Sequence, residues 1–360
     1  MDKLSLYTNG NLDALRDRTD PLADQAVVAL IQNPELNSIM NSWDQIPGDL
    51  PQDWPLELLN FLNFYQEIES KAPVALLKNG QKFFQEKGDL YLAMLGFYSL
   101  PYCYAFADGA EVLVRSNRIV NQIGERLGET GSFLLELFRP GAFFTNRVAY
   151  WTCAKVRLIH AFSRYFVERY ARDWNPDFGK PINQEDLIGT NLAFSLMVLR
   201  GFRKMGINLS TQESTTVLNY WHWVGQLMGL EVQFWPVTAK EAFELERLIR
   251  KRHLKYSEAG HTLISALIKF YEDSIPDPVL SKQAESIVSF FVGEEASKAL
   301  GLNQTLSIQG NLLGLLFRFT GFQTYGGKKD FRSIENQFRA NQLEQFGKVL
   351  QVQLPSLNRS

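Results

Sequence analysis

Apolar residues recur at intervals of three and four along almost the whole chain of 360 residues, and this periodicity restricts the fold more than any other feature. Strict alternation of apolar and polar residues, which marks half-buried strands, is hard to find over a useful length. The pattern therefore predicts an all-α protein. Because no linker, repeat or low-complexity tract divides the chain, we expect one large helical domain over residues 1–350 and a flexible tail at 351–360.

The charge balance and the apolar runs limit the partners and the location of the protein. The chain has 37 Lys and Arg against 39 Asp and Glu, which gives no electrostatic argument for a nucleic-acid partner. No run approaches the 18 or so uncharged apolar residues that membrane insertion requires, and the first residues are too polar for a secretory signal. The two cysteines, Cys103 and Cys153, show no metal or redox spacing. We expect a cytoplasmic protein, and the oligomeric state is not predicted.

One predicted helix is much longer than the others. It runs from about Ala142 to Tyr170, which is ~40 Å at 1.5 Å per residue, and most of its circumference is apolar, as in a buried helix. Intervals of three and four nevertheless place Arg157, His160 and Arg164 on one stripe of it. Later helices are expected at Thr215–Met228, Ala239–Arg252, Gly260–Tyr271, Lys282–Phe291 and Leu306–Phe319.

The two buried arginines need anions, because removing one partner of a buried ion pair costs about 3–5 kcal/mol. In one interpretation the protein supplies the anions, as an internal network of arginines and carboxylates around a hydrogen-bonded histidine. In the other, a ligand with two acidic groups supplies them and the imidazole binds its metal. Haem b fits the second description, because its iron takes an axial histidine and its two propionates take cationic donors. The spacing alone does not choose between them.

The segment "GERLGETG", residues 124–131, carries a second polar group on a predicted helix. Arg126, Glu129 and Thr130 share one helical face there. Two helices with polar groups on buried faces could bracket a cofactor from opposite sides. The alternative is an ordinary ion pair within one helix.

The remaining histidines give no metal-ligand spacing. His253 lies in the basic run "RKRHLKY", which is expected to be solvated, and no phosphate loop, dinucleotide fingerprint or hydrolase elbow is present.

The motif "VRLIHAFSRYF", followed by "WNPDFGKPINQEDLIGTNLAFS", resembles the latex clearing protein family of rubber oxygenases and the wider mpaB-type oxygenase family. The resemblance covers a core of about residues 105–230. It implies a globin-like helical core around a haem pocket, with His160 as the proximal ligand of haem b iron. Arg157 and Arg164 would then support the propionates or the haem edge, and Arg126 and Thr130 would lie on the other side of the haem.

The resemblance also implies a reaction. A haem-dependent oxygenase of the dioxygenase type would bind O₂ opposite His160 and act on a hydrophobic, unsaturated small molecule. Rubber oxygenases carry a lysine able to reach the distal iron site where this chain has Glu129, so we expect no lysine cap here. Glu129 or Glu111 would act as the base, together with Arg126 and Thr130. The alternatives are a haem-binding sensor or carrier without turnover, and a haem-free helical protein with internally paired arginines.

Overall fold

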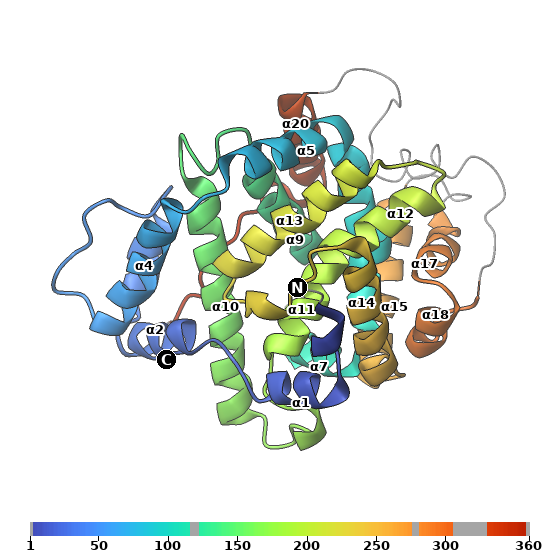
Figure 1. Cartoon of the computed structure of the whole chain (residues 1–360), viewed down its shortest axis with the longest axis horizontal. Helices are drawn as coiled ribbons and strands as arrows, with labels where there is room; N and C mark the ends of the chain where they lie inside the picture. The colour runs from blue at the N-terminus through green and yellow to red at the C-terminus, as the bar shows by residue number, and fades with distance from the viewer. Residues whose placement is uncertain (1–2, 116–121, 276–280, 305–329, 358–360) are drawn as a thin grey trace.

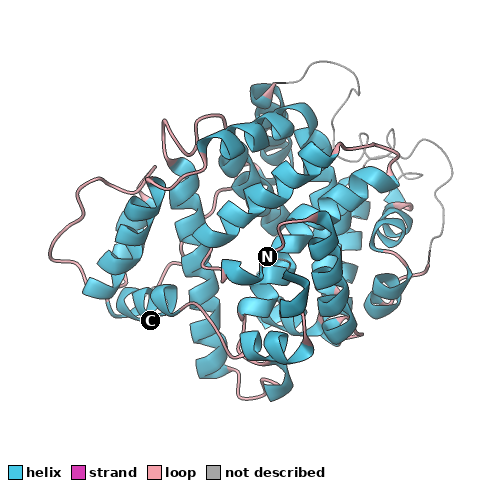
Figure 2. Ribbon diagram, in the orientation of Figure 1, coloured by secondary structure: helices cyan, strands magenta, loops and turns pink. Residues whose placement is uncertain are grey.

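The computed structural model describes residues 3–115, 122–275, 281–304 and 330–357, and these residues form an assembly of helices with no strand among them (Figures 1 and 2). The all-α prediction is therefore confirmed. The expected helix at Leu306–Phe319 lies outside the described residues. The helices are α1 (Asn9–Arg16), α2 (Pro21–Gln32), α3 (Glu35–Asn41), α4 (Leu56–Glu69), α5 (Val74–Met94), α6 (Leu100–Tyr104), α7 (Ala107–Arg115), α9 (Ile123–Phe138), α10 (Val148–Tyr170), α11 (Gln184–Leu192), α12 (Val198–Lys204), α13 (Thr211–Leu227), α14 (Ala239–His253), α15 (Glu258–Ser274), α17 (Ala284–Val292), α18 (Glu294–Leu300) and α20 (Phe331–Phe346).

Helix α10 crosses the molecule and organises the elements that matter for the site (Figure 1). Helix α2 packs along one side of it, with α4 beyond, and helices α9 and α13 contact it elsewhere. The helix is shorter than the predicted range of 142–170, because it starts at Val148. Gly141 has a φ of +81° and Arg147 a φ of +54°, and these left-handed conformations turn the chain before the helix begins.

Two π-helical turns, at Leu95–Ser99 and Ala193–Met197, lie inside longer helical stretches and pack against each other. The first precedes Pro101, which has no backbone N–H and whose ring clashes with a regular helix turn. The N–H of Leu100 bonds to the carbonyl of Leu95, one residue further back than in an α-helix. This wider turn lets the chain continue into α6, so the proline does not end the helix.

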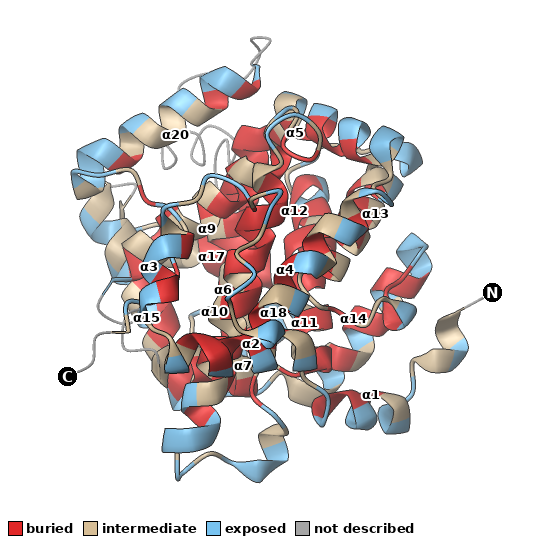
Figure 3. Ribbon diagram, turned by 90° about the vertical axis from the view of Figure 1, so that its left-hand side faces the viewer, coloured by how far each residue is buried: buried red, intermediate tan, exposed pale blue. Residues whose placement is uncertain are grey.

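The interior is apolar and almost continuous, and Figure 3 shows its buried positions along the inner helices. The segment 351–360, which was expected to be a flexible tail, contributes to it through Leu354, which is buried. After α20 the chain passes the end of α3, where the Asn41 side chain bonds to the backbone of Leu354. In the described residues, no helix combines the length and the apolarity needed to span a membrane.

Candidate functional site

A cavity of about 1160 Å³ lies beside α10. Its walls come from α6, α7, α9, α10, α11 and α13, and from the extended segment at 348–356. Aromatic and aliphatic side chains form much of this lining, among them Phe133, Phe162, Phe194, Trp221 and Met228. Ligand sites are typically about 300–1,000 Å³ and mostly apolar, so this cavity is large enough for a sizeable apolar ligand.

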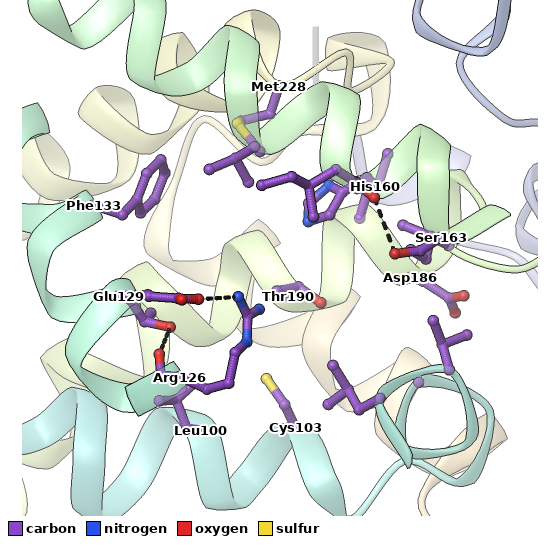
Figure 4. Close-up of a pocket in the computed structure, with 18 of the residues that line it drawn as sticks. Leu100, Cys103, Arg126, Glu129, Phe133, His160, Ser163, Asp186, Thr190 and Met228 are labelled. Carbon is purple, nitrogen blue, oxygen red and sulfur yellow. Dashed lines mark hydrogen bonds and ion pairs between the residues drawn. The ribbon is translucent and has the colours of Figure 1, made fainter. Parts of the chain in front are cut away.

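His160 projects from α10 into this cavity (Figure 4). Its Nδ1 atom is buried and has no hydrogen-bond partner among the described residues. Burial, followed by the positive charges of Arg164 and Arg126, lowers the pKa of His160 to about 3. The imidazole is therefore neutral at physiological pH, which is the form that binds a metal.

Arg157 is buried on another side of the same helix, facing α2. Its Nε and Nη2 donate to the two carboxylate oxygens of Asp20 at 2.5 and 2.8 Å. Its guanidinium also lies over the rings of Phe61 and Phe64, 5.5 and 4.7 Å from their centroids. Asp20 in turn caps the N-terminus of α2, where its side chain accepts from the N–H of Ala23.

Arg164 pairs with Asp24 of α2, one helical turn beyond Asp20. Its Nε donates to Asp24 at 2.7 Å, and its Nη1 donates to the carbonyl of Ile182 at 3.3 Å. Neither Arg164 nor Arg157 lines the cavity. Each guanidinium pairs with a carboxylate at α2, while Arg157 Nη1 and Arg164 Nη2 are buried without a hydrogen-bond partner among the described residues. The expectation that both arginines support the propionates or the haem edge stays a prediction.

The geometry of the helix explains why three residues on one stripe separate. At ~100° per residue, Arg157 and Arg164 lie within about 20° of each other, whereas His160 lies about 40–60° further round. On that side it joins the cavity-lining Val156 and Ser163. His160 thus stands at the border between the face that contacts α2 and the face that contacts the cavity.

The polar group predicted in the segment 124–131 does face the cavity, from α9. Arg126, Glu129 and Thr130 all line it. Figure 4 shows Arg126 and Glu129 on a different wall from His160. Arg126 Nη1 donates to Glu129 at 2.5 Å, so the ion pair within one helix that was considered as the alternative is present. The Thr130 hydroxyl donates to the carbonyl of Arg126 at 2.8 Å. Helix α9 thus brings two carboxylates to the cavity lining, those of Glu125 and Glu129.

Glu111 lies on α7 and is not part of the cavity lining. It pairs at 2.7 Å with Arg115, which does line the cavity. Arg115 also makes two hydrogen bonds of 2.9 Å to Asp173. The expectation that Glu111 acts as a base stays a prediction.

A buried group of charged and titratable residues on the cavity wall was not anticipated from the sequence. Asp108, Glu185, Asp186 and His253 line the cavity, with Arg16 of α1 among them. Arg16 Nη2 donates to Asp108 at 2.6 Å, and Nη1 lies 3.4 Å from Asp186. His253 Nε2 lies 3.0 Å from the Glu185 carboxylate. His253 is therefore part of a buried network, not of the solvated run that was expected.

The pKa values of the two acids on α11, Glu185 and Asp186, are shifted in opposite directions. Burial, followed by the neighbouring Asp108 carboxylate, raises the pKa of Asp186 well above its usual range. Burial alone would also raise the pKa of Glu185, but hydrogen bonds from His253 and Arg252 outweigh it and lower that pKa. Asp186 accepts hydrogen bonds from Arg16 and Asn183 at the cavity wall. The local signal is the pair "ED" inside "PINQED", although its partners lie up to 170 residues away along the chain.

Among the described residues, no group of three or more His, Cys, Asp and Glu side chains is arranged to hold a metal ion. Of the two histidines that line the cavity, His160 and His253, only His160 has a buried ring nitrogen without a hydrogen-bond partner among the described residues.

Comparisons with known proteins agree with this fold. Residues 104–321 match the family model described as the catalytic domain of ER-bound oxygenase mpaB/B'/rubber oxygenase. The chain therefore belongs to this oxygenase family. The rubber oxygenase of Streptomyces sp. (strain K30) is 22% identical over 255 residues, which cover 69% of this chain and 62% of that protein. The solved structure of latex clearing protein LCP in the closed state has the same fold, with a TM-score of 0.70 and 19% identity over 91% of each chain.

Proposed function

We propose that this protein is a haem b-dependent oxygenase that uses O₂ on a hydrophobic, unsaturated small molecule, with His160 as the axial ligand of the iron. One observation supports this proposal above all others. A neutral imidazole with a buried, unpartnered Nδ1 projects into an apolar cavity of about 1160 Å³. An unsatisfied buried polar group costs about 1–3 kcal/mol, so its retention favours a role in binding.

The residues present suit haem at the iron and along the walls, whereas the two arginines predicted to support the propionates do not line the cavity. His160 offers the neutral nitrogen that iron needs, and the surrounding side chains are apolar. The two haem carboxylates would meet cations on the cavity wall, for which Arg126 and Lys348 are the candidates. Both are now paired, with Glu129 and Glu125, and would exchange those partners for the haem. When bound, haem supplies the activation of O₂.

The chain's own residues account for the other requirements of such a reaction. Aromatic side chains around the cavity hold an apolar substrate and exclude water. Glu129 presents carboxylate oxygens that can accept a proton, with Arg126 and the Thr130 hydroxyl beside it. Asp186, whose pKa is raised by burial and by the Asp108 carboxylate, is a second titratable group, on another wall. A sensor or carrier without turnover would need neither acid–base group.

The ion pairs of Arg157 and Arg164 favour a second candidate, a haem-free helical protein. A haem-free protein should show carboxylates within about 3 Å of both arginines, and Asp20 and Asp24 lie at 2.5 and 2.7 Å from Arg157 and Arg164. These pairs explain the arginines, but they explain neither the cavity nor the unpartnered imidazole. Both pairs also face away from the cavity and are compatible with haem inside it.

The absorption spectrum of protein supplied with haem separates these candidates. We expect a Soret band in the wild type that shifts or disappears in His160→Ala, because the axial ligand is lost. His222→Ala is the matched control, since His222 is partly buried but does not line the cavity, and it should leave the band unchanged. His253→Ala tests the other histidine of the cavity wall.

Three results would be decisive. A folded wild type that stays colourless after reconstitution would leave the haem-free candidate. A Soret band unaltered in His160→Ala would remove this axial ligand. A band that behaves as expected, followed by O₂ consumption with alkenes that stops in Glu129→Gln, would support the oxygenase.

A further inference from the structure

The extended segment Lys348–Ser356 lies along the cavity, and every one of its nine residues contributes to the lining. Its side chains alternate, since Leu350 and Leu354 are buried and Val352 is partly buried, while Gln351 and Gln353 are exposed. This is the period-two pattern of an extended chain with one apolar face. It belongs to no sheet among the described residues, so its apolar face is turned toward the cavity and not toward a neighbouring strand.

Hydrogen bonds hold this segment at both ends. At one end, Ser132 donates to the carbonyl of Leu350 at 2.7 Å, and the N–H of Leu350 donates to Gln342 at 3.1 Å. At the other end, Asn41 makes two hydrogen bonds with the backbone of Leu354, at 2.8 and 3.0 Å. Neither set includes the three residues between, and Val352 lies midway between the two ends.

Gly128 of α9 leaves space for the side chain of Leu350. A Cβ atom added at Gly128 would come within 2.4 Å of Leu350 Cδ1, so only glycine lets the leucine lie against the helix. The carbonyl of Gly128 also accepts a hydrogen bond of 3.0 Å from Gln342, the same side chain that holds Leu350. Helix α9 therefore has a recess into which the segment fits.

We propose that residues 348–356 form a strap that sets the size of the apolar molecule the cavity admits, with Val352 as the side chain that limits it. The strap lies outside the range 104–321 that the chain shares with its family model. It is thus a feature by which this chain can differ in specificity from other members. A ligand must fit beneath a fixed strap, which favours a compact apolar molecule over a polymer threaded from that side. The identity of that molecule as an oxidised alkene rests on the proposed function; the size limit does not.

Cys103 provides a reporter inside the cavity. It lines the wall, whereas Cys153, the second of the chain's two cysteines, is fully buried and outside the lining. Burial raises the pKa of Cys103 to about 12, so its absolute reaction rates are slow. The ratio of two labelling rates removes this factor, since the thiolate fraction is common to both. Methyl and benzyl methanethiosulfonate provide a small and a bulky apolar reagent for this ratio.

The experiment measures the benzyl-to-methyl rate ratio at Cys103 by intact mass and peptide mapping, in the full chain as purified and after haem reconstitution. Asn41→Ala should raise the ratio about tenfold, because two hydrogen bonds of ordinary strength no longer hold the strap. Gly128→Ala should raise it by displacing Leu350, and Val352→Trp should lower it. Gln345→Ala is the matched control, because Gln345 is an exposed glutamine of α20 that lies outside both the strap and the cavity lining.

An equal ratio in all four variants would overturn the proposal. If Asn41→Ala fails to fold, Gly128→Ala and Val352→Trp still give shifts of opposite sign. Labelling needs no haem, so a colourless protein that shows these shifts would contradict the proposed function and leave the strap intact. A protein with a normal Soret band and a labelling ratio that is the same in all variants would support haem binding and contradict the strap.

Discussion

The polar side chains on the two sides of α10 have different partners. Toward α2, Arg157 and Arg164 each find a carboxylate, and Arg157 also stacks on two phenylalanine rings. Toward the cavity, His160 has a ring nitrogen that is buried and unpartnered. Toward α2, each arginine has an opposite charge within the protein, although Arg157 Nη1 and Arg164 Nη2 are also buried without a hydrogen-bond partner among the described residues. Toward the cavity, a neutral imidazole without a paired charge leaves its ring nitrogen available to a ligand.

This difference shows that polar residues on one helix stripe need not serve one purpose. The arginines fix α10 against α2 and thereby hold the helix from which His160 projects. Their contribution to any cofactor is to position the histidine, without touching the ligand. Variants on the two sides should therefore separate stability from binding, and the comparison can be tested in order of expected effect.

The largest effect is expected from Asp20→Asn. Asparagine keeps the cap of α2, because Asn and Asp cap helices about equally well, but it removes the negative charge beside the buried Arg157. We expect the free energy of unfolding to fall by about 3 kcal/mol, as for other buried pairs that lose one partner. Urea denaturation at pH 7.5 measures it.

The same variant separates the two roles proposed for Arg157. Protein that still folds should retain the haem absorption spectrum, since neither residue lines the cavity. A variant as stable as the wild type that no longer takes up haem would instead place Arg157 at the cofactor, and would break the comparison.

The second effect depends on pH and lies on the cavity side. His160 has a folded-state pKa of about 3, below the value of about 6.5 expected in the unfolded chain. As the pH falls below 6.5, the unfolded chain binds a proton that the folded protein does not, so stability is lost. Between pH 7 and pH 5 we expect a loss of about 1–2 kcal/mol from this group, the lower value applying if water fills the cavity.

The control for this prediction is His160→Leu, which removes the titrating group. Its unfolding free energy should lack this part of the pH dependence, so the difference between variant and wild type grows in favour of the variant at pH 5. Parallel pH profiles for the two proteins would show that the imidazole is not kept neutral by the fold.

The periodicity of the sequence was sufficient for the helices but not for the direction of their polar side chains. Spacings of three and four placed Arg157, His160 and Arg164 on one stripe, yet a stripe about 60° wide spans two environments. Asp20 and Asp24 lie 137 and 140 residues before their arginines, so nothing local identifies them as partners. Their own spacing of four, facing arginines seven apart, is a signal that becomes visible only when two helices are compared as a pair.

Two other features were hidden for different reasons. Arg16, Asp108 and His253 come together only through tertiary packing, and His253 was expected to be solvated because of the basic residues around it in the sequence. The strap, by contrast, was visible locally. The alternation of Leu350, Val352 and Leu354 with two glutamines is a strand-like pattern, but it is short and lies among polar residues, so it was taken for a loose tail.

The smallest effect, and the finest test of the comparison, is expected from Asp24→Asn. Arg164 keeps its hydrogen bond to the Ile182 carbonyl, and the Asp24 side chain is 31% exposed, so water already solvates part of this pair. The loss in unfolding free energy should be about 1 kcal/mol, because pairs reached by solvent are worth little. Measured beside Asp20→Asn under the same conditions, it gives a ratio of about three to one. Equal losses in the two variants would mean that burial does not set the strength of these pairs, and the distinction between a sealed scaffold side and an open cavity side of α10 would then need another physical basis.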